Sequence, residues 1–202
     1  MAPKRARASN AAETKSASSG LFLIKSEPDD FSLDDLANKE TECWDGVRNP
    51  IARKHLRAMS VGDQVLFYHS SCKDVGVVGV AEVTRDAYPD PSQFDASSKY
   101  YDPKSTQEQP RWDSVDVKFV SRLPRTVGLK ELKEIAAAPG EGQDVLSDFA
   151  LLRMSRLSVM PVEQRVWDFI LALADQEPPE PKKKKRKSKA KAEDSDGGSD
   201  GQ

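Results

Sequence analysis

The distribution of apolar residues confines folding to the middle of the chain. Residues 177–202 contain no aromatic residue and no aliphatic residue larger than Ala, and residues 1–20 are basic and rich in Ala and Ser. Such segments cannot bury enough surface to offset the entropy lost on ordering, so we expect both to be disordered. The sequence therefore predicts one domain over residues 21–176, between a basic N-terminal segment at 1–20 and a tail at 177–202.

Charge is divided unevenly between this domain and the tail. Residues 21–176 contain 19 basic and 26 acidic residues, a net charge of −7, so broad attraction to phosphate is excluded as the main binding force. If the domain binds nucleic acid, it needs a shaped pocket, with the tails adding long-range attraction. The tail carries a basic cluster that is typical of a nuclear localisation signal, formed by Lys182, Lys183, Lys184, Lys185, Arg186 and Lys187.

The basic cluster predicts a nuclear protein that is carried by an import receptor, the alternative being a non-specific solvated patch. No signal peptide precedes the first apolar run, and that run, Leu21 to Ile24, is too short to span a membrane. With only Cys43 and Cys72 as cysteines, we expect a soluble, intracellular, reduced protein without a membrane partner. We also expect a monomer.

Hydrophobic patterning predicts an α+β fold. Strands are expected at 21–27, 64–70, 75–83, 115–119 and 157–160, the second and third forming a hairpin, and helices near 32–36, 49–59, 129–138 and 145–153 and from Pro161 onward. In the helix at 49–59, Asn49 is the expected N-cap, and Ile51, Leu56 and Met59 the inner face. Residues 86–111 form a long ordered excursion. Because strands and helices do not alternate regularly, a small curved sheet or barrel of about five to six strands with peripheral helices fits best.

The segment from Cys43 to Pro50 is the most informative one for function. It places Trp44, Asp45, Gly46, Arg48 and Asn49 immediately before a helix start. An aromatic ring, a guanidinium and an amide held together at a pocket rim suit stacking on, and hydrogen bonding to, a nucleobase. The alternative is a core tryptophan beside a local Asp45–Arg48 ion pair. Trp112 could form a second aromatic wall, while Trp167 lies beside an apolar helix face and is expected to be structural.

Catalytic and metal-binding patterns are weak. There is no glycine-rich phosphate loop and no serine nucleophile elbow. His69, Cys72, Cys43 and His55 could supply four zinc ligands, but they lack a paired Cys-x-x-Cys spacing. A Cys72–His69 nucleophilic pair has no evident orienting group. We therefore expect no metal, no cofactor and no catalytic residue.

Several segments, in this order, resemble the EVE domain family. They are Lys25-Ser26-Glu27-Pro28, Trp44-Asp45-Gly46-Val47-Arg48-Asn49, Phe67-Tyr68-His69-Ser70, Gly76 to Glu82, Ala87-Tyr88-Pro89-Asp90, Trp112 with Val115-Asp116-Val117, and Arg156-Leu157-Ser158-Val159. Pro50-Ile51 stands where relatives usually carry Tyr-Gln. The resemblance implies a PUA-like fold similar to the YTH domains that read methylated adenine in RNA. It also implies binding of modified bases, including modified cytosines such as 5-methylcytosine in DNA, without chemical conversion.

The same resemblance implies a pocket for an extruded base. Its implied border is Lys25, Ser26, Trp44, Asn49, Tyr68, His69, Ser70 and Trp112, to which we add Asp45, Gly46, Val47 and Arg48 from the same segment. The sequence thus favours a nuclear, non-catalytic reader of a modified base in DNA or RNA. A nuclease or base-processing enzyme using Asp45, Glu27 and His69 is the first alternative, and a protein-interaction adaptor the second.

Overall fold

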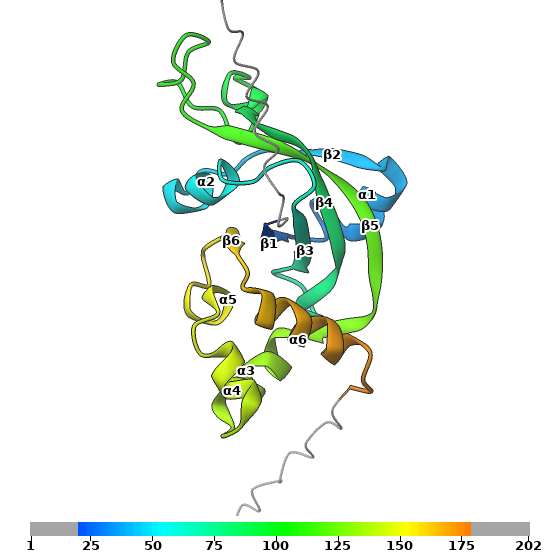
Figure 1. Ribbon diagram of the computed structural model, residues 1–202. Coiled ribbons are helices and arrows are strands. Elements are labelled where there is room, and N and C mark those ends of the chain that lie inside the picture. The colour runs from blue at the N-terminus through cyan, green and yellow to red at the C-terminus, as the bar shows by residue number, and fades with distance from the viewer. Residues whose placement is uncertain (1–19, 179–202) are drawn as a thin grey trace, which may run out of the picture.

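The computed structural model describes residues 20–178, and its centre is a curved, open sheet (Figure 1). Six strands pair in the order β2-β5-β4-β3-β1-β6. β1 and β3 run parallel, and the other neighbouring pairs run antiparallel. The bounds are β1 (Leu21–Ser26), β2 (Thr41–Trp44), β3 (Gln64–His69), β4 (Gly76–Pro89), β5 (Asp113–Gly128) and β6 (Val159–Pro161).

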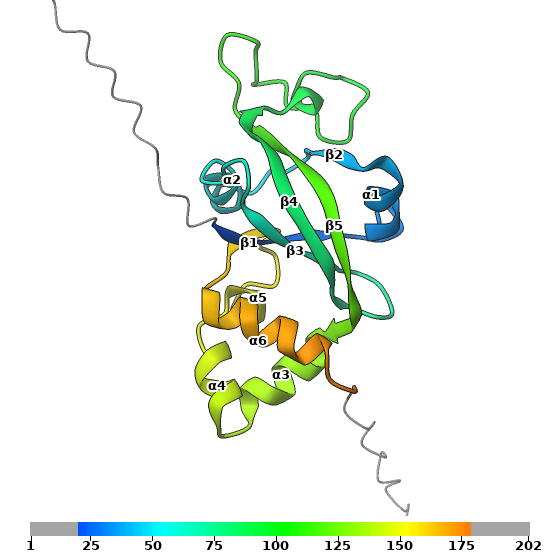
Figure 2. The ribbon, with the colours of Figure 1, turned by 45° about the vertical axis from the view of Figure 1, so that its right-hand side comes forward.

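The helices divide into two groups around this sheet. In Figure 2, α1 and α2 lie on opposite sides of the long strands β4 and β5, and α3 to α6 gather at one end of the molecule. Their bounds are α1 (Leu33–Lys39), α2 (Pro50–Leu56), α3 (Leu129–Ala137), α4 (Glu141–Leu146), α5 (Ala150–Arg153) and α6 (Gln164–Ala174), with a 3₁₀ turn η1 (Pro91–Gln93). No helix between residues 20 and 178 combines the length and hydrophobicity that crossing a membrane would need.

Local sequence explains where the first two helices begin. Ser32 caps α1 and forms a reciprocal capping box with Asp35, which satisfies two backbone donors at once. The Asn49 side chain accepts hydrogen bonds from the backbone N–H groups of Ile51 and Ala52, and Pro50 occupies the first turn of α2. Both helix starts match the sequence prediction.

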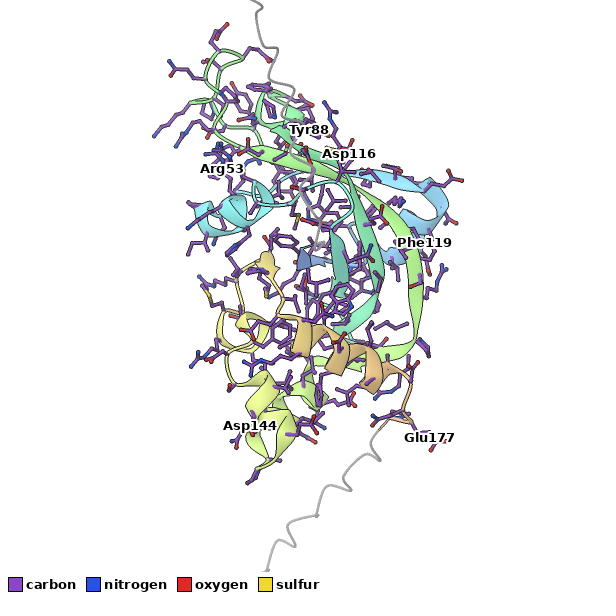
Figure 3. All side chains as sticks on the ribbon, viewed as in Figure 1. Arg53, Tyr88, Asp116, Phe119, Asp144 and Glu177 are labelled. Atoms are coloured by element: carbon purple, nitrogen blue, oxygen red, sulfur yellow. The ribbon has the colours of Figure 1, made fainter. Side chains whose placement is uncertain are left out.

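The core lies between the sheet and the surrounding helices. Leu23 and Ile24 of β1 and Leu66 and Phe67 of β3 are fully buried, because both faces of these central strands are covered. β4 and β5 are far longer than predicted and change register at several points, as expected of strongly bent strands. At their upper ends the Tyr88 hydroxyl donates to the Asp116 carboxylate over 2.6 Å, and Figure 3 shows the two side chains together.

Two predictions about individual residues need correction. Ile51 is 48% exposed, and Ala52 is buried in its place, because Ala52 lies four residues before the buried Leu56 and so shares its helix face. Pro161 does not start the last helix; it pairs with Phe22 in the sheet, and α6 begins at Gln164. The fold class is confirmed as α+β, and the sheet is open rather than a closed barrel. The predictions for residues 1–19 and for the basic cluster at 182–187 lie outside the described residues.

Candidate functional site

A cavity of about 700 Å³ opens where β1 and β3 end, a volume within the usual range for a small-ligand cleft. Because the two strands run parallel in adjacent positions, their carboxyl ends meet and place Lys25, Ser26, Tyr68 and Ser70 together on its lining. Further lining comes from the segment after β2, from the 90–112 excursion, and from α3, α5 and the turn before β6. Residues far apart in sequence therefore share one cavity.

Lys25 and Tyr68 form the floor between the two strands. They are register partners, and the Lys25 ammonium lies 5.6 Å from the centre of the Tyr68 ring while donating to the Ser155 carbonyl over 3.1 Å. Burial lowers the pKa of Lys25 and raises that of Tyr68 to about 12. The Tyr68 hydroxyl is thus protonated at neutral pH and can donate a hydrogen bond into the cavity.

Trp44 belongs to both the core and the cavity wall. Its side chain lines the cavity, yet the residue is only 8% exposed. Its ring packs edge-on against Phe67, with centroids 5.4 Å apart, and against Phe31 at 6.3 Å. Such T-shaped contacts fix the orientation of the indole. Both interpretations of this tryptophan, as core and as wall, therefore hold together.

Asp45, Gly46 and Val47 also line the cavity. Burial is the main cause of a raised pKa at Asp45, the nearby Asp90 carboxylate adds to it, and Arg48 opposes it. A carboxyl group with a perturbed pKa in a cleft is characteristic of functional sites. Eight of the twelve predicted pocket residues border this cavity: Lys25, Ser26, Trp44, Asp45, Gly46, Val47, Tyr68 and Ser70.

Arg48 does not line the cavity but holds the excursion at residues 90–112, of which Lys99 and Tyr100 border the cavity. Its guanidinium donates to the Asp90 carboxylate over 2.7 Å, to the Ser92 hydroxyl over 3.0 Å and to the Tyr100 carbonyl. Tyr100 in turn contributes its side chain to the cavity lining. The local Asp45–Arg48 ion pair, the alternative interpretation of this segment, is not formed, and Arg48 pairs with the fully buried Asp90 instead.

Gly46 makes room for Tyr100. Its φ is +71°, and a Cβ built there would lie 2.5 Å from the Tyr100 ring. Glycine alone combines that backbone conformation with that contact. Gly46 and Arg48 thus act on the same residue: Gly46 leaves space for the Tyr100 ring, and Arg48 hydrogen-bonds to the Tyr100 carbonyl.

Trp112 does not form the second wall, and the expectation that it shares a pocket with Trp44 needs correction. It is absent from the cavity lining. Its indole N–H donates to Asp102 over 2.8 Å, and the Arg48 guanidinium lies 5.4 Å from its ring. Its backbone is held by the amide of the fully buried Gln93. The residue therefore fixes the base of the excursion, and Tyr100 takes the place at the cavity.

Asn49 and His69 have structural partners and do not line the cavity. Asn49 caps α2. The His69 Nε2 accepts a hydrogen bond from the Leu33 N–H over 3.1 Å, and burial lowers the pKa of its imidazole. Of the groups named for an enzyme, Asp45 and Glu27 border the cavity and His69 does not. Residues 20–178 contain no group of three or more His, Cys, Asp or Glu side chains that could hold a metal ion.

Sequence reasoning missed much of the remaining lining. Phe31, Lys99, Tyr100, Lys133, Ser155 and Arg156 border the cavity without having been assigned to it. A signal existed for two of them, because Tyr100 is an aromatic residue inside a polar excursion and Arg156 begins a segment that resembles the family. Lys133 carries no such signal, since a lysine on an amphipathic helix is ordinarily a solvated surface residue.

A bent mixed sheet with a cleft at the carboxyl ends of its parallel strands and helices gathered around it defines this chain as a PUA-like domain. The EVE domain family matches residues 21–173, and the chain belongs to that family.

Relatives with the same architecture come from animals and bacteria. Thymocyte nuclear protein 1 of Mus musculus is 43% identical over 171 residues, 79% of this chain and 76% of the relative. The solved structure of human THYN1 protein in complex with DNA containing 5-methylcytosine is 41% identical, with a TM-score of 0.76 over 79% of this chain and all of that one. A crystal structure from Pseudomonas putida is 46% identical, with a TM-score of 0.70 over 76% of this chain and 99% of the other.

Proposed function

We propose that this protein is a nuclear reader that binds a modified cytosine in DNA without converting it. The observation that carries the proposal is the cavity beside Trp44 and Tyr68, which combines aromatic walls with polar groups at the strand ends. Support comes from the human relative, 41% identical, which is described in complex with 5-methylcytosine-containing DNA. An extruded base would stack on the aromatic walls and be read at its edge by polar groups.

The chemistry of the lining suits a cytosine edge. Cytosine presents an amino donor that carboxylates accept, and Asp45, Glu42 and Glu27 border the cavity. Lys25 and the protonated Tyr68 hydroxyl can donate to the base acceptors. One stacked base supplies about 1–3 kcal/mol, so contacts outside the cavity must contribute to a tight complex.

The nuclear part of the proposal rests on the sequence and on relatives. Five curated relatives are named thymocyte nuclear protein 1, and the chain carries the basic cluster Lys182–Lys187. An import receptor would bind this cluster, and the cluster would add attraction to phosphate.

A binding screen tests the proposal. The full chain is titrated with oligonucleotides that differ in one central base, cytosine or 5-methylcytosine, in single- and double-stranded DNA and in RNA. We expect tighter binding to the modified DNA than to its plain counterpart, and equal affinity for all probes would contradict the assignment. The same samples, incubated with and without magnesium, manganese or zinc, are then digested to nucleosides and analysed by mass spectrometry. Conversion or cleavage that disappears in Asp45→Asn would establish the enzyme alternative instead.

A further inference from the structure

The free positive charge of the domain gathers on one side of the cavity. Within residues 20–178, six Lys and Arg side chains have no carboxylate of the described residues within 4.0 Å, and they are Lys25, Lys54, Lys73, Lys104, Lys133 and Arg156. Lys25, Lys133 and Arg156 line the cavity. Lys73 lies in an adjoining groove of about 510 Å³. A domain with a net charge of −7 thus places four of these six unpaired cations at the cavity and the adjoining groove.

The groove continues the cavity along α3. Val75, Leu129 and Lys133 line both of them, and Lys73, Lys130, Glu134 and Ala137 extend the groove further. Lys130 is 86% exposed and 3.9 Å from Glu134, a weak surface pair. The groove therefore combines apolar residues with three lysines and one carboxylate. This excess of positive charge suits a chain of phosphates whose sugars contact the apolar residues.

The cavity lining also carries carboxylates. Glu27, Asp30, Glu42 and Asp45 border it, on the loop after β1, in β2 and directly after β2. Two of these carboxylates are paired, Asp30 with Lys99 at 2.7 Å and Glu42 with Lys39 at 2.6 Å. The groove, with Lys73, Lys130 and Lys133 against Glu134, carries the larger excess of positive charge, so the charge distribution favours that direction for a nucleic acid backbone. In Figure 1, that direction leads from the ends of β1 and β3 toward α5 and α3.

We propose that the groove along α3, with Lys73, Lys130 and Lys133, binds the phosphodiester backbone that flanks the extruded base, together with Arg156 of the cavity lining. This assignment rests on the proposed function, because the cavity supplies the base and the groove supplies the neighbouring phosphates. Each lysine or arginine that contacts a phosphate releases a counterion, so the number of contacts determines how steeply the affinity falls with salt concentration.

The test compares two charge-matched double variants of the full chain. Lys73→Ala/Lys133→Ala removes two exposed, unpaired lysines from the groove, and Lys54→Ala/Lys104→Ala removes two exposed, unpaired lysines that line neither cavity nor groove. Affinity for a 5-methylcytosine oligonucleotide is measured over a range of salt concentrations. We expect the groove variant to bind roughly tenfold more weakly and its salt slope to fall by about 1.5, the contribution of two phosphate contacts. The control variant should match the wild type.

Equal affinity and equal slope for the two double variants would overturn the groove assignment. Binding of the free nucleoside 5-methyl-2′-deoxycytidine, which has no phosphate, should be unchanged in the groove variant; a matching loss there would also overturn it, since the lysines would then act on the cavity. Failure of the base-reader proposal looks different. In that case the wild type binds plain and modified oligonucleotides equally, whatever the groove variant does.

Discussion

At the scale of single residues, Tyr68 is the position where ligand binding can be changed with the least effect on packing. Its ring is buried between strands, while its hydroxyl makes no hydrogen bond with a described residue and borders the cavity. Tyr68→Phe should therefore leave the free energy of unfolding nearly unchanged. It should weaken binding to the modified oligonucleotide by about 0.5–1.5 kcal/mol, the net value of one hydrogen bond. Calorimetric titration and denaturant unfolding measure the two effects.

The matched control for Tyr68→Phe is Tyr101→Phe. Tyr101 is 44% exposed and does not border the cavity. If both variants bind like the wild type, the Tyr68 hydroxyl does not contact the ligand.

Gly46 allows a second prediction at this scale. Gly46→Ala places a methyl group against the Tyr100 ring and imposes a positive φ, whereas Gly62→Ala imposes a φ of +92° with no atom within 4 Å. We expect Gly62→Ala to cost about 1–2 kcal/mol of stability. Gly46→Ala should cost about 1–3 kcal/mol more, because the ring must move. Urea unfolding of the two variants isolates the contact, and equal losses would show that Tyr100 does not press on Gly46.

At the scale of elements, the 90–112 excursion depends on one buried ion pair. Asp90 is fully buried and Arg48 is 23% exposed. Removing the guanidinium leaves an uncompensated charge, so Arg48→Ala should lower the free energy of unfolding by about 3–5 kcal/mol. Hydrogen exchange should report faster opening of residues 90–112 than of β1 and β3. Exchange that accelerates uniformly across the domain would show that the excursion is not a separate unit.

The same ion pair predicts a dependence on pH. Burial by itself raises the pKa of Asp90, but hydrogen bonds from Ser92, Arg48 and the Gly46 N–H overcome it and hold that pKa below its ordinary value. A carboxyl group with a lowered folded-state pKa stabilises the fold above its unfolded pKa, near about 3.9. That stabilisation is lost as the pH falls through the pKa that Asp90 has in the folded state. The stability difference between wild type and Arg48→Ala should thus be constant near neutrality and shrink below about pH 4; a constant difference in acid would contradict this.

Sequence patterns predicted the helices and strands better than they predicted which strands pair and which residues meet at the cavity. The helix starts at Ser32 and Asn49 and the hairpin after Gln64 follow from local capping and alternation, so they were predictable. The strand at Thr41–Trp44 was missed because its four residues are mostly exposed or half-buried and show no clear alternation. The pairing of β1 with β3 crosses about forty residues, and no local pattern encodes it. Trp112 was placed at the cavity for the same reason, because only the long-range fold decides which aromatic residue reaches a pocket.

At the scale of the whole molecule, the division of charge predicts separate roles for domain and tails. A chain limited to residues 20–178 should retain its preference for the modified base, because the cavity lies within it. It should bind any oligonucleotide more weakly and with a shallower salt slope than the full chain, because it lacks the basic clusters. Titrations at several salt concentrations measure both quantities, and identical slopes would contradict the separation.

Nuclear import through the basic cluster is a second prediction for the whole molecule. Replacing Lys182, Lys183, Lys184 and Lys185 with Ala in a fluorescent fusion should reduce nuclear accumulation, because the receptor loses its basic peptide. The control is Lys4→Ala with Arg5→Ala and Arg7→Ala, which tests the other basic end of the chain. Accumulation that survives both sets of changes would exclude these clusters as import signals.

The cavity draws its walls from residue 25 to residue 158, and this has a consequence for how the protein is made. During synthesis, Lys25 and Tyr68 leave the ribosome long before Arg156 and Ser158. A nascent or prematurely terminated chain that ends before α5 lacks the lining residues from Leu151 to Ser158 and also β6, the strand that covers the outer edge of β1. Incomplete products therefore cannot compete with the finished protein for the same mark. The ability to bind therefore requires that translation has passed Ser158, near the end of the domain.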